Sequence, residues 1–280
     1  MVLAMAEKRK YAVIFDGSFE GFLCTIYAYY YDKITPLYLQ SDDGYQQVLD
    51  VEEYYIATNY DKAVRVQSGI RNKISSQAED YLTYAFLSSP FTSVSSISHS
   101  PSSSSINHDY YLNMFWYIIL GFKVGKSVDN HLQKDYVLFV HKKARAVARE
   151  AHLLCGFSRF AETKQKLFYC SISPVHNVLP ILAEHFQDRM MNQAWIIHDK
   201  KRNQAAVYDG RRYVIEDVPK NIRDVRLDYD DKEELIQSLW GTFFNTVTIK
   251  ERTNKKLQRN NLPLHFRKSM TEFSISYTDQ

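Results

Sequence analysis

Four short apolar segments between residues 166 and 218 constrain the fold more than any other part of this sequence. They read KLFYCSIS (166–173), AWIIHD (194–199), QAAVYDG (204–210) and RYVIEDV (212–218). Their length and their alternation of apolar and polar residues predict strands. The segment NVLPILAEHFQDRMM (177–191) has helical spacing and lies between the first strand and the second. The sequence therefore predicts a β-α-β-β-β block here.

Most of the remaining sequence has the apolar spacing of helices. Helices are predicted over residues 18–33, 109–120 and 134–155 and again from residue 230, and one or two helices over 61–88, with short strands at 11–17 and 54–60. Ser18 is the expected N-cap of the first helix, and Gly156 is the expected C-cap of the helix over 134–155. The helical spacing of the first helix is that of Phe19, Phe22, Leu23, Ile26 and Tyr30. The fold class expected is α+β, a single domain over residues 1–280 that is mostly helical with a small mixed or antiparallel sheet.

Residues 88–105, SSPFTSVSSISHSPSSSS, are rich in serine and contain two prolines. Such a composition buries too little apolar surface to offset the entropy lost on ordering. We expect a disordered surface insertion with no site in it.

The composition excludes several classes of protein. Thirty-five basic and 32 acidic side chains give a net charge of +3, so total charge does not identify a polyanionic partner. Cys24, Cys155 and Cys170 form no CxxC pair and no HExxH motif is present, so we predict no disulfide scaffold, no metal site and no cofactor. The N-terminus lacks the apolar segment of a signal peptide, and the longest apolar run is too short to span a membrane. We expect a cytoplasmic protein without membrane contact.

The helix predicted over residues 134–155 has one basic face. That face consists of Lys142, Arg145, Arg149 and His152, which are three, four and three residues apart. Arg159 and Phe160 follow the helix closely, and an arginine beside an aromatic ring suits a phosphate and a stacked base. A second basic segment near the C-terminus contains Lys250, Arg252, Lys255, Lys256, Arg259, Arg267 and Lys268. These features predict nucleic-acid binding; the alternative is the solvated face of an ordinary helix.

Histidines supply a possible catalytic centre. His185 lies on the helix of the β-α-β unit, and His198 and Asp199 end a predicted strand. A histidine oriented by a carboxylate is the usual apparatus for proton transfer. With His152, these residues are the catalytic candidates. The alternative is that the histidines form structural hydrogen bonds and that Asp199 begins a turn.

Seven motifs, taken in order, resemble a bacterial family of domains of unknown function described as probable DNA metabolism or repair proteins. They are YAVIFDGSFEGFLCTIY, IATNYDKAVRVQSGIRNKIS, GFKVGKSV, ARAVAREAHLLCGFSRFAE, YCSISPVHNVLPILAEHFQDRM, WIIHDKKRNQAAVYDG and IKERTNKKLQRNNLPLHFRKSMTEF. The resemblance spans residues 11–273. In that family the domain is typically encoded beside a radical-SAM protein, and in some chains it precedes a uracil-DNA-glycosylase-like domain. The present chain lacks the CxxxCxxC motif of a radical-SAM cluster, so the resemblance implies the companion of that enzyme.

The resemblance also suggests which residues contact DNA. The cations at matching motif positions are Lys62, Arg65, Lys73, Arg145, Arg149, Arg159 and Arg189. The basic face and the basic C-terminal segment add Lys142 and Arg252, and Phe160 is the expected stacking ring. Asp16 lies in a matching motif, although Asp16–Gly17 is also ordinary turn chemistry. The serine-rich insertion departs from the family pattern.

The function expected is a DNA-binding accessory protein in DNA repair or base modification that acts with a radical-SAM partner. A first alternative is a hydrolase on DNA, a nuclease or glycosylase-like enzyme that uses the histidines and Asp199; convergence of these side chains in a cleft would favour it. A second alternative is a protein-binding scaffold for the radical-SAM partner, which an exposed apolar patch would favour.

Overall fold

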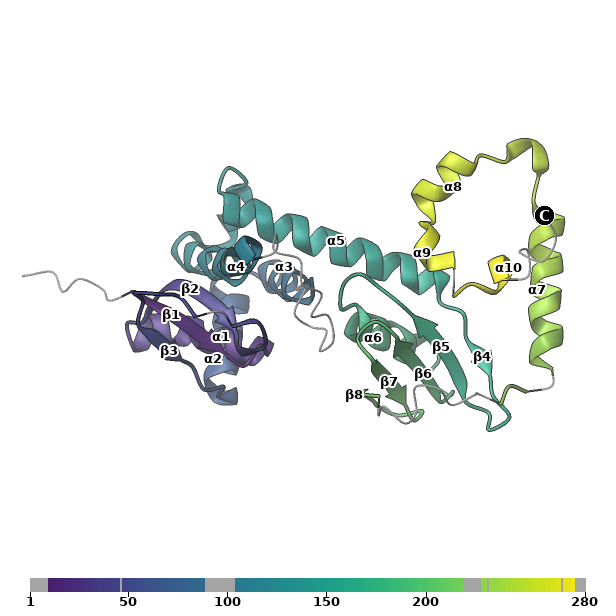
Figure 1. Ribbon diagram of the computed structural model, residues 1–280, viewed down its shortest axis with the longest axis horizontal. Coiled ribbons are helices and arrows are strands. Elements are labelled where there is room, and N and C mark those ends of the chain that lie inside the picture. Colours follow the sequence, from purple (N-terminus) through teal and green to yellow (C-terminus); the bar gives the residue numbers. More distant parts are fainter. Residues whose placement is uncertain are drawn as a thin grey trace, which may run out of the picture. The chain divides into compact units, whose positions relative to one another are not determined.

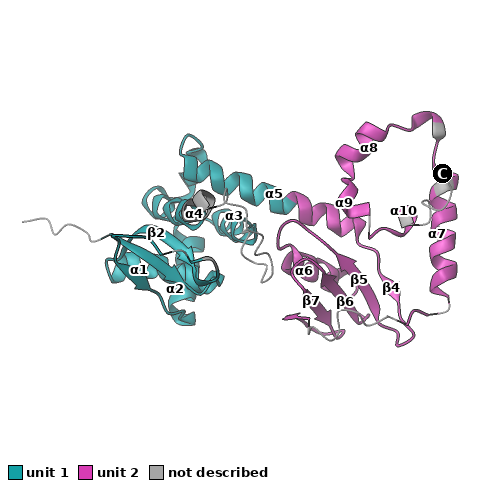
Figure 2. Ribbon diagram, viewed as in Figure 1, with its two compact units in different colours: residues 1–148 teal, residues 149–280 magenta. Residues whose placement is uncertain are grey.

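The computed structural model describes residues 10–45, 47–88, 104–218, 228–230, 232–267 and 269–274. The chain divides into two compact units, residues 1–148 and 149–280, and helix α5 (Asp135–Phe157) continues from the first into the second (Figure 2). Each unit contains one sheet, so the fold is α+β as the sequence predicts, with two sheets in place of the one expected. That the two units act as a single domain stays a prediction. Most of the predicted insertion at 88–105 lies outside the described residues.

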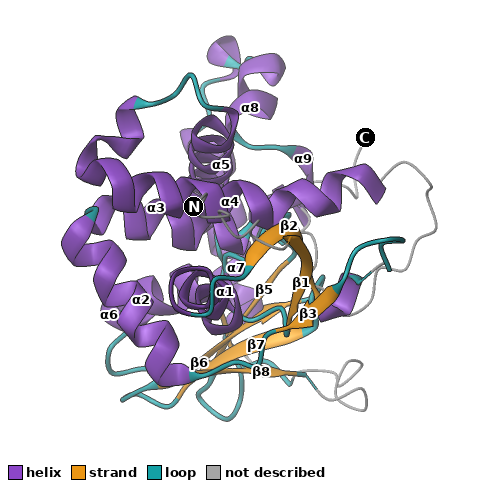
Figure 3. Cartoon of the chain, turned by 90° about the vertical axis from the view of Figure 1, so that its left-hand side faces the viewer, coloured by secondary structure: helices purple, strands orange, loops and turns teal. Residues whose placement is uncertain are grey.

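The first unit is built on a three-stranded parallel sheet with the order β2-β1-β3. Its elements are β1 (Lys10–Phe15), α1 (Phe19–Tyr31), β2 (Thr35–Ser41), η1 (Asp42–Gly44), β3 (Glu53–Tyr55), α2 (Tyr60–Lys73), α3 (Ser76–Leu87), α4 (Ser104–Val124), η2 (Gly125–Asn130) and the first part of α5. Parallel neighbours need a crossover, and α1 supplies the one from β1 to β2. Helices α1 and α4 contact strands of this sheet (Figure 3). The central strand β1 is buried from Ala12 to Phe15, as expected for a parallel strand covered on both faces.

Helix α1 buries one face and exposes its last turn. Ser18 is its N-cap, as predicted: the Oγ accepts a hydrogen bond of 2.9 Å from the backbone N–H of Gly21. Phe22, Leu23 and Ile26 are fully buried in the core of the first unit. Tyr30, which has the same helical spacing as these residues, is 39% exposed. The next residue, Tyr31, is also exposed, and the helix therefore ends in tyrosines that the core does not use.

No strand is predicted from the sequence at the position of β2. Strand β2 pairs in parallel with β1, and the register shifts between Tyr11 and Ala12, opposite Pro36. Proline donates no backbone hydrogen bond and is tolerated in an edge strand such as β2. Pairing with the buried strand β1 overrides a weak local signal here.

The second unit holds a mixed sheet with the order β4-β5-β6-β7-β8 (Figure 1). After α5 its elements are β4 (Ala161–Glu162), β5 (Phe168–Ile172), α6 (Leu179–Arg189), β6 (Trp195–Asp199), β7 (Gln204–Tyr208), β8 (Tyr213–Asp217), α7 (Glu233–Val247), η4 (Lys250–Arg252), α8 (Lys255–Asn261), α9 (Leu264–Arg267) and α10 (Thr271–Ser274). Strands β5 and β6 are parallel and joined by α6, whereas the other neighbours are antiparallel. The β-α-β-β-β block predicted from the sequence is confirmed.

Helix α5 runs past its predicted end. Gly156, expected as the C-cap, lies inside the helix, which ends at Phe157. A Cβ added at Gly156 would meet no atom within 4 Å. Neither the backbone conformation nor close packing therefore requires a glycine at position 156.

Asp16 joins the loops that follow β1 and β3. Its carboxylate accepts hydrogen bonds from the Ser18 N–H (3.0 Å), the Ser18 hydroxyl (2.6 Å) and the Thr58 hydroxyl (2.7 Å). Burial raises the pKa of Asp16, but these hydrogen bonds outweigh it and leave the pKa lowered. Gly17 follows with φ of 80°, in agreement with the reading of Asp16–Gly17 as a turn. A Cβ at Gly21 would lie 2.1 Å from Asp16 Oδ1 and 2.7 Å from Thr58 Oγ1.

The same substitution at two helical glycines is predicted to have opposite effects on stability. Gly156→Ala adds a side chain in open space and should raise the free energy of unfolding by about 0.5–1 kcal/mol through helix propensity. Gly21→Ala displaces the Asp16 carboxylate and should lower it by about 1–3 kcal/mol, because hydrogen bonds to a charged group are lost. Urea unfolding of both variants measures the difference. A stabilised Gly21→Ala protein would contradict the role assigned to Asp16.

Candidate nucleic-acid interface

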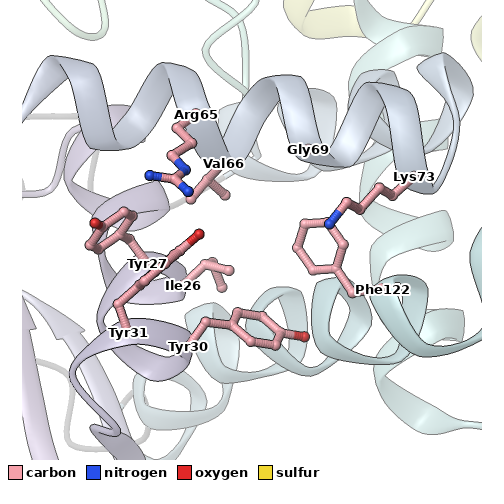
Figure 4. Close-up of a pocket in the computed structure, with 9 residues that line it drawn as sticks. All are labelled: Ile26, Tyr27, Tyr30, Tyr31, Arg65, Val66, Gly69, Lys73 and Phe122. Carbon is pink, nitrogen blue, oxygen red and sulfur yellow. The ribbon is translucent and has the colours of Figure 1, made fainter.

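The first unit contains a pocket of about 590 Å³ between α1, α2 and α4 (Figure 4). The residues that line it are Ile26, Tyr27, Tyr30 and Tyr31 of α1, Arg65, Val66, Gly69 and Lys73 of α2, and Phe122 of α4. The volume falls within the range of about 300–1,000 Å³ found for ligand sites. Two cations and four aromatic rings thus surround one space.

Helical spacing places these side chains. Arg65, Gly69 and Lys73 are four residues apart, so they lie along one face of α2. Tyr27 and Tyr31 have the same spacing on α1. A Cβ at Gly69 would lie 3.5 Å from the Phe122 ring, so the glycine leaves space beside that ring.

The aromatic rings are paired with each other and with cations. Tyr27 and Tyr31 stack with centroids 4.2 Å apart and an interplanar angle of 19°. Lys62 Nζ lies 4.9 Å from the Tyr27 centroid, and Arg65 Cζ lies 4.9 Å from the Tyr31 centroid. Cations over ring faces are attracted to the ring quadrupole. Two of the predicted DNA contacts, Lys62 and Arg65, are therefore held against tyrosines of α1.

The charge at the pocket is positive. Within the described residues neither Arg65 nor Lys73 forms an ion pair, whereas Arg71 on the same helix is paired with Glu79 at 2.6 Å. Burial and the neighbouring Tyr29 raise the pKa of Tyr30. Its phenol, like that of any tyrosine at neutral pH, is able to donate a hydrogen bond. This combination suits an anionic ligand with a flat, apolar part.

The basic face predicted on α5 is exposed. Lys142, Arg145, Arg149 and His152 all face solvent, whereas the apolar residues Ala144, Val147, Ala151 and Leu154 are buried. The division falls between Ala148 and Arg149, so the first two cations belong to the first unit and the last two residues to the second. The two-faced helix is confirmed, and the binding of DNA by its basic face stays a prediction.

Arg159 is committed to contacts within the second unit. Its guanidinium donates to Glu272 at 2.6 and 3.2 Å and to the carbonyl of Gly156 at 2.9 Å, and it lies 5.6 Å from the Trp240 ring. Glu272 is buried and also accepts a hydrogen bond of 3.2 Å from Trp240 Nε1. These contacts tie α7 and α10 to the end of α5, which favours a structural role for Arg159.

The other predicted contacts of the second unit are scattered over separate elements. Phe160 packs edge-on against Phe186 at 4.9 Å, half-buried. Arg189 is exposed in the last turn of α6. Arg252 is exposed in η4 and lines a second pocket of about 470 Å³ with residues of α7 and α8.

His198 and Asp199 do not form the catalytic pair that the sequence suggests. Successive residues of a strand point to opposite faces of a sheet, and β6 follows this rule, with Asp199 fully buried and His198 half-buried. Asp199 is bound to Arg202 at 2.9 Å and accepts the backbone N–H groups of Lys201 and Arg202, so it begins a turn. His198 Nδ1 lies 2.9 Å from the hydroxyl of Tyr169, whose pKa burial raises to about 12.

The remaining catalytic candidates are exposed on helices. His185 lies on α6 with its ring against that of Phe186, and His152 lies on α5. Among the residues that the structure describes, no group of three or more histidine, cysteine, aspartate or glutamate side chains is placed to hold a metal ion. In the same residues no helix is both long and apolar enough to cross a membrane.

The sequence does not predict the aromatic half of the pocket. Tyr27, Tyr31 and Phe122 are not among the DNA contacts expected from it, and Tyr30 enters only through the helical spacing of α1. The signal was present as YAYYY at the end of α1, where three consecutive tyrosines cannot all face one core.

The Arg159–Glu272 pair predicts a loss of stability in acid. Burial raises the pKa of Glu272, but the hydrogen bonds from Arg159 and Trp240 leave it lowered overall. A lowered pKa stabilises the fold above the ordinary glutamate value of about 4.3, and this contribution is lost as the pH falls through the folded value. Glu272→Gln should lower the free energy of unfolding by about 1.5–3 kcal/mol at pH 7 and by progressively less below pH 4, as measured by urea unfolding. The exposed Glu234→Gln is the control, and a pH-independent cost at Glu272 would contradict this account.

Comparison with known proteins places the chain in a family. No curated protein matches the sequence. No solved structure matches it either. The sequence model of DUF4130, a domain of unknown function, matches residues 109–272, which is more than half of the chain and includes Phe122, α5 and most of the second unit. The chain therefore belongs to the DUF4130 family of domains of unknown function.

Proposed function

We propose that this protein is a DNA-binding accessory protein of DNA repair or base modification. The observation that carries the proposal is the pocket of the first unit, where Arg65 and Lys73 stand among tyrosines without a carboxylate partner in the described residues. Cations that neutralise phosphates, together with rings on which bases stack, are the usual parts of a nucleic-acid site.

The exposed basic face of α5 adds to this support. Lys142 and Arg145 in the first unit and Arg149 in the second are available to phosphates, because their side chains face solvent. The resemblance of the sequence motifs to probable DNA metabolism proteins, typically encoded beside a radical-SAM protein, supplies the process and the partner. A hydrolase receives no comparable support, since Asp199 is neutralised by Arg202 in the interior.

Charge reversal tests DNA binding. Arg65→Glu with Lys73→Glu should weaken DNA binding at least tenfold and reduce the salt dependence of log K by about 2, because each lost phosphate contact removes about 1 from the slope. Arg145→Glu with Arg149→Glu tests the face of α5 in the same way. Fluorescence anisotropy at several salt concentrations gives both quantities.

Lys134→Glu is the matched control, because Lys134 is an exposed cation of the first unit outside the pocket. It should leave the slope nearly unchanged. If neither double variant differs from this control, these cations face only solvent and the proposal fails. A denaturing gel of the same mixtures reports cleavage, which would replace the accessory role by an enzymatic one.

A scaffold for the radical-SAM partner is the second candidate, and the outer face of α7 favours it. Leu235, Leu239 and Phe243 are four residues apart and 61%, 59% and 55% exposed. They form an apolar stripe on one side of the helix, opposite the side that carries the buried Glu233 and Gly241. An exposed apolar stripe on a helix is a common mode of docking to another protein.

The stripe predicts a specific loss of partner binding. Leu239→Lys should abolish co-purification of the co-expressed radical-SAM protein and leave DNA affinity unchanged, because a charge on the stripe opposes its burial. Ser238→Lys places the same charge on the flank of the helix and should retain the partner. Equal retention by both variants would exclude the stripe as the docking site.

A further inference from the structure

The shape of the pocket in the first unit limits what part of a DNA molecule enters it. Its base is apolar, with Ile26 and Val66 buried between α1 and α2. Figure 4 shows the Tyr30 and Phe122 side chains and the Lys73 and Arg65 side chains arranged around this base, from three helices. The two rings meet nearly at right angles, with centroids 5.6 Å apart and an interplanar angle of 87°.

A recess of about 590 Å³ takes a small group and not a double helix. Duplex DNA keeps its bases stacked inside and presents phosphates at its surface, so it would contact Arg65 and Lys73 and leave the rings unused. An unpaired base exposes its faces, and proteins bind such bases on aromatic side chains. Phosphates on either side of that base are the anions that Arg65 and Lys73 suit.

The exposure of the tyrosines supports the same ligand. Tyr30 and Tyr31 expose 39% and 53% of their surface although they adjoin buried residues of α1. Tyr31 is already stacked on Tyr27 and covered by Arg65, which leaves Tyr30 and Phe122 as the rings for a base.

We infer that this pocket holds one unpaired nucleotide of single-stranded DNA, with the base against Tyr30 and Phe122 and the adjoining phosphates at Arg65 and Lys73. The inference rests on the proposed DNA-binding function and specifies its substrate class. It makes the protein a reader of unpaired strands, such as those exposed when a damaged base is processed.

The test compares a labelled dT12 strand, a 12-base-pair duplex and an rU12 strand by anisotropy. Wild-type protein should bind dT12 at least tenfold more tightly than the duplex. Tyr30→Ala should weaken dT12 binding about tenfold and leave duplex binding within twofold, because only the unpaired base uses the ring. Tyr30→Phe keeps the ring and should restore most of the affinity.

Gly69→Leu is an independent variant that keeps Tyr30 and fills the pocket beside the Phe122 ring. It should reproduce the loss seen with Tyr30→Ala, because the added side chain occupies the space of the base. Tyr60→Ala removes a tyrosine of α2 that is 72% exposed and does not line the pocket, so it should have no effect.

The outcomes separate the two proposals. Absence of binding to every nucleic acid overturns both. Equal binding of strand and duplex, with no effect of Tyr30→Ala or Gly69→Leu, overturns the unpaired-nucleotide pocket and leaves DNA binding intact. Tighter binding of rU12 than of dT12 assigns the pocket to RNA, and displacement of dT12 by polyglutamate as effective as by unlabelled dT12 assigns it to acidic protein segments; either overturns the inference.

Discussion

The burial of one face of α1 is the constraint on which the candidate site depends. Phe22, Leu23 and Ile26 lie in the core between the sheet and the neighbouring helices, and this fixes the rotation of α1 about its axis. Once that rotation is set, the last turn directs Tyr27, Tyr30 and Tyr31 toward α2 and α4. The packing of the apolar part of α1 thus determines where the side chains of its last turn point. Substitutions in the core are therefore expected to change the pocket without touching it.

The cations of the pocket differ from the arginines of the interior in what lies beside them. In the second unit Arg159 and Arg202 are buried or half-buried and each is matched by a carboxylate, because an unpaired charge in the interior is costly. In the first unit Arg65 and Lys73 remain at the surface without such a partner in the described residues, and aromatic rings take the place of an acid beside Arg65. A ring holds the guanidinium in position and leaves its charge available to a ligand.

The sequence predicts regular elements well and the meeting of distant elements poorly. The strands of the second sheet follow from their own alternation, and Ser18 follows from capping chemistry. Strand β2 depends on pairing with β1, and no local sequence pattern around Pro36 predicts it. The pocket joins residues from about positions 26–31, 65–73 and 122, so it exists only once α1, α2 and α4 have packed.

The alternation of side chains along a strand is enough to exclude the catalytic pair of His198 and Asp199. His198 and Asp199 are consecutive in β6, so their side chains lie on opposite faces whatever the details of packing. Arg159 differs, because its partner Glu272 is 113 residues away and no local rule finds it. The predicted residues Lys62, Arg65 and Lys73 share helix α2, so the helical period predicts that they lie near one another. The period of α2 does not predict which tyrosines of α1 lie opposite them.

A net charge of +3 is compatible with binding a polyanion, because attraction depends on where the charges are and not on their sum. At physiological ionic strength a charge acts over about 8 Å, so acidic residues elsewhere in the chain are screened from a phosphate at Arg65 or Lys73. What matters is the local set of groups, and the pocket lining contains two cations, four rings and no carboxylate among its described residues. Aromatic rings add affinity that salt does not screen, since stacking requires no net charge. Binding that depends on phosphate contacts and on ring stacking is therefore weakened by salt. It keeps a residual affinity for unpaired bases when the phosphates are fully screened.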